Sequence, residues 1–262
     1  MSAEVYRQSQ VELRDYFAIA FDIRGLDKAM PVMDEVGRYA AVAKFNAAKI
    51  RIGLDRIYPE VVRRDMKLWD DGKYNDTPRT MRDSVAESTA AGARLITVHM
   101  KNSDEALEAA LKARDEERSR MQKELGTDYD PLVGTLLGIT ALTSYDEKEY
   151  KRDYGTDDIE GSVLELAKRA ARLGLDGVVC SANELQALNN DEETRPLLKV
   201  TPGLILAGGE AGTGQKRVNT FAGAIALGAD IVVGGSAITG ADDISEAAQR
   251  ALGEIAGALR RG

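Results

Sequence analysis

The chain contains few of the residues that build disulfide-rich or histidine-based sites. Cysteine and histidine each occur once among the 262 residues. The single cysteine, Cys180, excludes an intrachain disulfide and favours a reducing, cytoplasmic compartment, and its apolar neighbours in GVVCSA predict a packed residue rather than a nucleophile. The single histidine, His99, gives little support to Ser–His or histidine–metal chemistry, so we expect it to be a hydrogen-bonded neighbour of a site rather than its base.

Long apolar runs and an excess of positive charge are also missing. No apolar stretch is long enough to span a bilayer, and MSAEVYRQSQVELRDYF at the beginning has no apolar signal core, so we expect no membrane partner. The formal net charge is −8, which argues against a nucleic-acid partner and means that an anionic substrate needs local positive charge. Hydrophobic residues make up 44% of the chain, enough for a sizeable core.

Short apolar segments alternate with longer segments of helical periodicity. This alternation predicts parallel βαβ units, and eight of them in 262 residues predict a single (β/α)₈ TIM barrel of the α/β class, one domain over residues 1–262. The competing fold is an open doubly wound sheet, but FDIRGLDKA after the first predicted strand contains no glycine-rich dinucleotide loop. The predicted strands cover residues 17–23, 39–47, 66–73, 94–100, 132–142, 177–182, 197–205 and 230–237.

Polar residues gather at the carboxyl ends of the first five predicted strands. In a closed barrel these ends meet at one mouth, where active sites form. Each residue by itself is explained by a solvated loop, but several on one rim favour a common site. The residues are Asp22, Lys44, Asp71, Lys73, His99, Thr143 and Ser144.

The stretch DDGKYNDTPRT combines acids and a lysine at the end of the third predicted strand. Residues i and i+2 of a strand share a face, so Asp71 and Lys73 project together. Asp76 follows on the turn, next to a proline that suits a helix start. With Lys44 on the neighbouring strand, these residues predict an alternating array of two lysines and two or three carboxylates.

A second copy of the D-x-K-x-x-D spacing lies just upstream, in DMKLWD, with Asp65, Lys67 and Asp70. Asp65 and Lys67 come at the start of the strand, at the barrel floor, where polar residues usually serve stability. No Pro-Thr turn follows at the matching offset. We therefore assign the chemistry to the downstream copy.

The downstream copy resembles the signature of the orotidine 5′-phosphate decarboxylase family, D-x-K-x-x-D-x-P-x-T, at residues 71–80. The resemblance covers nearly the whole chain. AFDI, AKFNA with its Lys44, ITVHM, ITALTS, LGLDGVVCSANE, TPGLILAGGEAGTGQKRV and LGADIVVGGSAIT follow in the order of the family.

The resemblance implies a decarboxylation that needs neither a metal nor a cofactor. Asp71 matches the aspartate that lies near the carboxylate of the substrate, orotidine 5′-phosphate, and Lys73 matches the lysine that protonates C6. Lys44 and Asp76 would complete the charge network. In family members the residues that match Asp76 and Thr80 reach the site of the partner subunit, so a homodimer is implied.

The same resemblance implies further contacts with the substrate. Asp22 would contact the ribose, and Thr143 and Ser144 would meet the edge of the pyrimidine. The glycine-rich segment from Pro202 to Gln215 would be the lid that closes on the phosphate. A surface loop without function is the other interpretation of that segment.

Two positions depart from the family in ways that remove positive charge from the expected phosphate site. The last strand of the family usually ends in Gly-Arg, whereas this chain has Gly235 and Ser236. Many bacterial members carry an arginine soon after Thr-Pro-Gly, where this chain has Ile205. Serine does not replace a bidentate guanidinium. Backbone N–H groups near Gly235 remain as anion donors. The expected lid also carries side chains that could reach the phosphate, namely Gln215, Lys216 and Arg217.

Two alternative functions stay open. The first is a related barrel enzyme that acts on a sugar phosphate or an unphosphorylated substrate. The sugar-phosphate relatives need a Mg²⁺ site with an acid on the second strand, where this chain has Lys44, which repels a cation. The second is a pyrimidine-binding barrel without activity, which the buried charges disfavour because an ion array is costly to bury.

Overall fold

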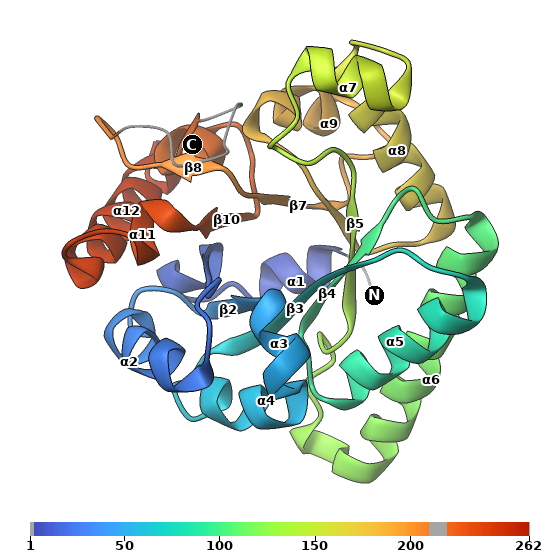
Figure 1. Cartoon of the computed structure of the whole chain (residues 1–262), viewed down its shortest axis with the longest axis horizontal. Coiled ribbons are helices and arrows are strands. Elements are labelled where there is room, and N and C mark those ends of the chain that lie inside the picture. The colour runs from blue at the N-terminus through green and yellow to red at the C-terminus, as the bar shows by residue number, and fades with distance from the viewer. Residues whose placement is uncertain (1–2, 210–218, 262) are drawn as a thin grey trace.

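A computed structural model describes residues 3–209 and 219–261. Its parallel strands close into one barrel in the order β1-β10-β7-β6-β5-β4-β3-β2, which confirms the predicted α/β barrel (Figure 1). The barrel strands are β1 (Phe17–Ala20), β2 (Val42–Phe45), β3 (Lys67–Tyr74), β4 (Leu95–His99), β5 (Thr135–Ile139), β6 (Gly177–Val179), β7 (Leu198–Thr201) and β10 (Ile231–Gly234).

Helices follow the strands and surround the barrel (Figure 1). Local signals set several of their starts: Pro78 occupies the first turn of α5, and the Ser103 hydroxyl accepts the N–H of Ala106 at the start of α6. Among the helices of residues 3–209 and 219–261, none has the length and apolar composition that crossing a bilayer requires. The helices are α1 (Ala3–Gln8), α2 (Leu26–Val36), α3 (Ala47–Ile52), α4 (Leu54–Val62), α5 (Pro78–Ala90), α6 (Asp104–Leu125), α7 (Glu147–Tyr154), α8 (Ile159–Leu173), α9 (Leu185–Asn190), α10 (Phe221–Ala226), α11 (Ser236–Thr239) and α12 (Ile244–Leu259).

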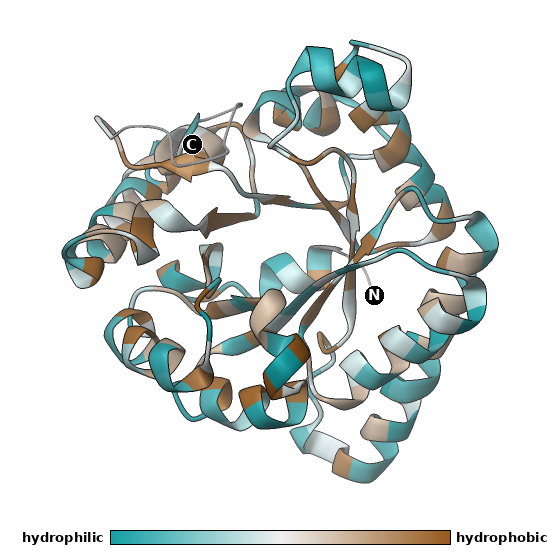
Figure 2. Ribbon diagram, viewed as in Figure 1, coloured by the Kyte–Doolittle hydropathy of each residue, from teal (hydrophilic) through white to brown (hydrophobic). Residues whose placement is uncertain are grey.

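The alternation of side chains along each strand separates two hydrophobic cores. On β1, Ala18 and Ala20 belong to the cluster that fills the barrel, whereas Phe17 and Ile19 pack in the larger cluster between the strands and the helices. Figure 2 shows hydrophobic residues along the strands and hydrophilic residues on the outer sides of the helices. A strand residue therefore faces either the barrel or the helices according to its parity.

The segment predicted as one strand over residues 197–205 is divided, so that prediction was wrong in its extent. β7 ends at Thr201, and β8 (Leu204–Ile205) pairs with β9 (Asn219–Thr220) in a separate two-stranded sheet. Pro202 has no backbone N–H to donate, and Gly203 has a φ of 78°, so the barrel strand ends there. The other predicted strands are confirmed, although most are shorter than the predicted segments.

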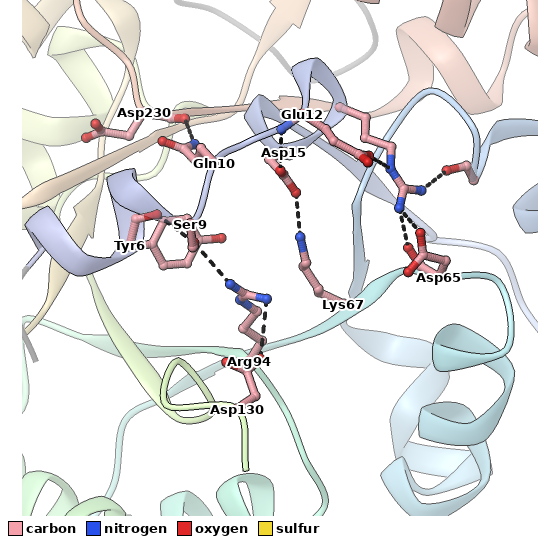
Figure 3. A network of polar contacts seen from close by, with 12 residues as sticks. Tyr6, Ser9, Gln10, Glu12, Asp15, Asp65, Lys67, Arg94, Asp130 and Asp230 are labelled. Carbon is pink, nitrogen blue, oxygen red and sulfur yellow. Dashed lines mark hydrogen bonds and ion pairs between the residues drawn. The ribbon is translucent and has the colours of Figure 1, made fainter. Parts of the chain in front are cut away.

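The amino-terminal helix α1, which the sequence pattern did not predict, covers the end of the barrel where the strands begin. Tyr6 of α1 is 3% exposed and packs with the cluster that fills the barrel. The guanidinium of Arg94 lies 5.5 Å from the centre of the Tyr6 ring and donates to Ser9 Oγ at 3.2 Å (Figure 3). Helix α1 therefore covers this end of the barrel, whereas the carboxyl ends of the strands lie at the opposite end.

The upstream D-x-K-x-x-D copy lies partly at this closed floor. Lys67 donates to the carboxylate of Asp15 (Figure 3). Arg14 pairs with Asp65. Both partners come from the segment before β1, so these charges fasten that segment beneath the barrel. Asp70, the last residue of this copy, points to the outer face of β3.

Candidate active site

Strand β3 presents its polar residues to two different environments. Trp69 belongs to the cluster inside the barrel and Leu68 to the cluster under the helices. By strand parity, Asp71 shares the inward face of Trp69, and the side chain of Lys73, which lies within a register shift between β3 and β4, meets Asp71 there. In the pairing of β2 with β3, Lys44 is opposite Trp69, so its side chain enters the barrel beside Asp71 and Lys73.

A short-range charge array forms at the mouth of the barrel. Oδ2 of Asp71 accepts from Lys44 Nζ at 2.7 Å and from Lys73 Nζ at 2.5 Å. Oδ1 of Asp71 accepts from the Thr97 hydroxyl at 2.9 Å, and the same hydroxyl accepts the N–H of Lys73 at 3.0 Å. The carboxylate is therefore fixed from three strands, β2, β3 and β4.

The two lysines of the array favour the ionised form of Asp71. Burial of Asp71 opposes its charge, but Lys44 and Lys73 outweigh that penalty and lower the pKa of Asp71 below its usual range. The Asp71 side chain is 4% exposed and that of Lys73 is 32% exposed. Asp22, exposed at the rim, lies 4.0 Å from Lys44 Nζ. Two ammonium groups thus share one buried carboxylate, and Lys73 is the more exposed of the two.

A cavity of about 200 Å³ opens over this array. It brings six of the residues predicted from sequence together: Lys44, Asp71, Lys73, Thr143, Ser144 and Pro202. Its other walls are largely apolar, a combination typical of small-molecule sites. These walls come from Trp69, Ile139, Ala141, Leu142, Val179 and Cys180.

Several residues of the site were not assigned to it from the sequence. Thr97 lies two residues before His99 on β4, and strand parity would have placed both on the inward face. Trp69 and Cys180 were expected to pack, and they are 1% exposed, but they also line the cavity. Burial raises the pKa of the Cys180 thiol, which fits a packed residue better than a nucleophile.

Asp76 and Thr80 do not join the array within this chain. Both side chains are exposed. The Asp76 carboxylate accepts the N–H of Thr77 at 2.7 Å, and hydrogen bonds from Thr77 and Thr80 lower the pKa of Asp76. The backbone N–H of Asp76 donates to Asn102 Oδ1 at 3.0 Å, so the turn is fixed while the side chain lies exposed at the surface.

Gly235 and Ser236, which were assigned to phosphate binding, lie apart from the lining of the cavity. Gly235 precedes α11, Ser236 is its exposed first residue, and neither lines the cavity. Pro202 lines the cavity at the end of β7. Gln215 lies outside the described residues, together with most of the glycine-rich part of the expected lid.

His99 ends β4 as a neutral hydrogen-bond acceptor. Its Nδ1 accepts the N–H of Lys101 at 3.2 Å. Burial, together with the charges of Lys101 and Lys73, lowers the pKa of His99 below the ordinary 6.5. The neutral imidazole is therefore the form that the fold favours at neutral pH.

The lowered pKa of His99 predicts a specific pH dependence. Because the folded state favours the neutral ring, its contribution to stability is present above the unfolded value of about 6.5 and is lost as the pH falls through the folded value. The chain has one histidine, so every imidazole C–H resonance that titrates in a proton NMR experiment on untagged protein belongs to His99. We expect its midpoint below 6.5, and a midpoint above that value would contradict the assignment.

A larger hollow lies away from the array. It has a volume of about 620 Å³, and it shares no lining residue with the cavity over Asp71. Its single lysine, Lys148, is outnumbered by carboxylates, so it repels anions. Those carboxylates belong to Asp146, Glu147, Asp157, Asp158, Glu160 and Glu184.

Comparison with known proteins gives a consistent result. A family model described as "Orotidine 5'-phosphate decarboxylase / HUMPS family" matches residues 15–251. A protein of Maridesulfovibrio salexigens named orotidine 5′-phosphate decarboxylase is 31% identical over 244 residues, 90% of this chain and 97% of that protein. One of Synechococcus sp. (strain WH7803) with the same name is 36% identical over 216 residues, 79% of this chain and 85% of that protein.

A solved structure shows the same fold. The crystal structure of orotidine 5′-phosphate decarboxylase from Lactobacillus acidophilus matches with a TM-score of 0.73 and 23% identity, over 91% of this chain and 98% of that one. At that identity the likeness concerns the barrel, while the family rests on the sequence matches.

Proposed function

The chain belongs to the orotidine 5′-phosphate decarboxylase / HUMPS family, and we propose that it converts orotidine 5′-phosphate to UMP and CO₂ in de novo pyrimidine biosynthesis. The observation that carries the proposal is the Asp71 carboxylate, held between the ammonium groups of Lys44 and Lys73 under a small, largely apolar cavity. The single, buried cysteine supports a cytoplasmic location.

In the proposed mechanism Lys73 is the proton donor. The bond between C6 and the carboxylate breaks, its electron pair stays on C6, and CO₂ leaves. C6 then takes a proton from the Lys73 ammonium. Solvent later returns a proton to the Lys73 amine. A fixed ammonium beside a developing carbanion stabilises the transition state more than the ground state. Asp71 holds that ammonium in place. Its own carboxylate would also repel the carboxylate of the substrate.

The remaining predicted residues fit subsites around this centre. Thr143 and Ser144, in the cavity wall, would meet the edge of the pyrimidine. Asp22, at the rim beside Lys44, would contact the ribose. Pro202 would mark the beginning of the segment that closes over the substrate.

We also propose a homodimer in which each site is shared. Asp76 and Thr80 are exposed, and Asn102 holds the backbone beneath Asp76, so the carboxylate is presented outward. In a two-fold dimer the same surface of each chain meets its copy. Asp76 would then approach Lys73 of the partner subunit and complete the alternation of charges.

The phosphate subsite gives a prediction at Ser236. Among residues 3–209 and 219–261, none would lie within 4 Å of an ideal Cβ on the neighbouring Gly235, and Ser236 is itself exposed, so a longer side chain has room. We expect Ser236→Arg to tighten UMP binding about tenfold, since a charged hydrogen bond adds about that much affinity. Isothermal titration with UMP and with uridine measures the effect.

The control for this variant is Ser236→Met, which adds length without charge. We expect tighter binding of UMP by Ser236→Arg but not by Ser236→Met, and no tighter binding of uridine by either variant. Unchanged or weaker UMP binding by Ser236→Arg would show that the phosphate is held elsewhere.

Lys44 distinguishes the proposed reaction from that of the sugar-phosphate relatives. Those enzymes require an acid at this position on the second strand to bind Mg²⁺. Here the position carries an ammonium group 2.7 Å from Asp71. The same ammonium explains why an anionic substrate can approach the buried carboxylate.

The direct test mixes the purified protein with orotidine 5′-phosphate and follows the loss of its absorbance. The same assay is repeated with unphosphorylated orotidine as substrate, and with a chelator added to the orotidine 5′-phosphate reaction. We expect turnover of the phosphorylated substrate that the chelator leaves unchanged. Turnover of orotidine alone, or a loss of activity that Mg²⁺ restores, would support the alternative functions, and an inert but ligand-binding protein would support a binding role.

A further inference from the structure

A second buried charge cluster lies directly behind the site, on the outer face of β3. Asp70 is fully buried, and its Oδ2 accepts from the Tyr74 hydroxyl at 2.8 Å and from the Ser88 hydroxyl at 2.5 Å. Its Oδ1 pairs with Lys49 Nζ, which also donates to the Tyr74 hydroxyl at 2.9 Å. The cluster links β3 to α3 through Lys49 and to α5 through Ser88.

The position of this cluster is unusual for a barrel strand. Leu68, two residues earlier on the same outward face, packs in the core between strands and helices. A hydrophobic residue at position 70 would suit that core, whereas a buried ion pair is weak support for stability. Burial opposes the charge of Lys49, but Asp70 outweighs that penalty and raises the pKa of Lys49, so the ammonium group keeps its charge.

The cluster surrounds the point where the backbone of β3 departs from regular geometry. The register between β3 and β4 shifts between Asp70 and Tyr74. Within this shift Lys73 has a φ of 47°, a left-handed conformation that few residues other than glycine adopt. At Gly72 a Cβ would come within 2.6 Å of the Tyr74 ring and 2.7 Å of Lys49 Nζ, so the cluster is packed tightly against the backbone.

The direction of Lys73 depends on this local geometry. Without the left-handed turn at Lys73, its side chain and the following residues would take a different course. Asp70 and Tyr74 flank the turn on either side and are joined to each other through a hydrogen bond and through Lys49. The outer cluster therefore braces the turn from behind, as Thr97 does from inside the barrel.

We propose that Asp70 is a positioning residue, which together with Lys49, Tyr74 and Ser88 holds the end of β3 in the turn that keeps the Lys73 ammonium on Asp71. The inference rests on the proposed function, because it assigns Lys73 the reacting proton. Displacement of a reacting group by about 1 Å can cost ~10²-fold in rate. The cluster would thus act on the rate of the chemical step rather than on ligand affinity.

The main test replaces the whole ion pair by apolar residues, in the double variant Lys49→Met with Asp70→Leu, so that no buried charge is left unpaired. We expect kcat for orotidine 5′-phosphate to fall by about 10- to 100-fold, while the Kd for UMP changes by less than about threefold. Tyr74→Phe, which removes one hydroxyl, should lower kcat by a few-fold in the same way and serves if the double variant does not fold.

The matched control is Lys67→Met with Asp15→Leu, the same exchange at the other end of β3. It should lower the melting temperature without changing kcat per folded molecule. A merely structural role for Asp70 predicts this same pattern for both double variants, and that result would overturn the proposal.

A crystal structure of the Lys49→Met, Asp70→Leu variant separates this inference from the proposed function. We expect Lys73 Nζ to leave Asp71, from which it now lies 2.5 Å. An unchanged contact overturns the positioning role, whether or not the protein decarboxylates orotidine 5′-phosphate. Absence of turnover by the unaltered protein would overturn the proposed function instead.

Discussion

Lys73→Ala is expected to lower decarboxylation of orotidine 5′-phosphate by at least ~10⁴-fold, because it removes both a proton donor worth ~10²-fold or more and a fixed charge worth a similar factor. The fold should persist, since Asp71 keeps its contacts with Lys44 and Thr97. Single-turnover kinetics and a melting curve on the same preparation measure the two effects separately.

Lys67→Ala is the control for this variant. Lys67 is on the same strand and occupies the equivalent position in the upstream copy of the D-x-K-x-x-D spacing. Its side chain, however, pairs with Asp15 at the closed floor. It should retain kcat with a modest loss of stability. Near-normal turnover by Lys73→Ala, or an equal loss of kcat in Lys67→Ala, would rule out Lys73 as the proton donor.

Mixing two inactive variants is expected to restore activity if the site is shared between subunits. In a heterodimer of Lys73→Ala and Asp76→Asn chains, one site combines the intact Lys73 of one chain with the intact Asp76 of the other. After random exchange of equal amounts, half of the dimers are mixed and each has one intact site, so about a quarter of the wild-type rate should return. Dilution, reassociation and assay of the mixture measure the recovery.

The control mixture combines Lys73→Ala with Asp71→Asn, two changes within the site of one chain. None of its dimers regains an intact site, so no recovery is expected. Full activity of Asp76→Asn alone, or equal recovery in both mixtures, would contradict the shared site. A monomeric mass in solution would contradict the dimer itself.

Much of the site was predictable because β-strand periodicity is a local property. The i, i+2 spacing placed Asp71 and Lys73 on one face, and the strand order placed Lys44 beside them. The same rule would have found Thr97, two residues before His99. The division of the predicted strand at Pro202 was also a local signal, which the apolar run around it concealed.

Other features depended on contacts between distant segments. Asp70 was grouped with Asp65 and Lys67 by their spacing, yet it forms its own cluster with Lys49 and Ser88 from two helices. The left-handed conformation of Lys73 cannot be predicted from the backbone preferences of lysine, because such a conformation persists only where surrounding contacts impose it.

The sequence by itself determined the alternation of strands and helices, the closed barrel and the inward direction of Asp71, because hydrophobic period and strand parity are set residue by residue. Only the tertiary structure decided which carboxylate oxygen the two lysines share, how Asp70 braces the strand from behind, and that Asp76 faces outward. Those arrangements depend on side chains that meet only after the barrel has closed, and no local pattern records them.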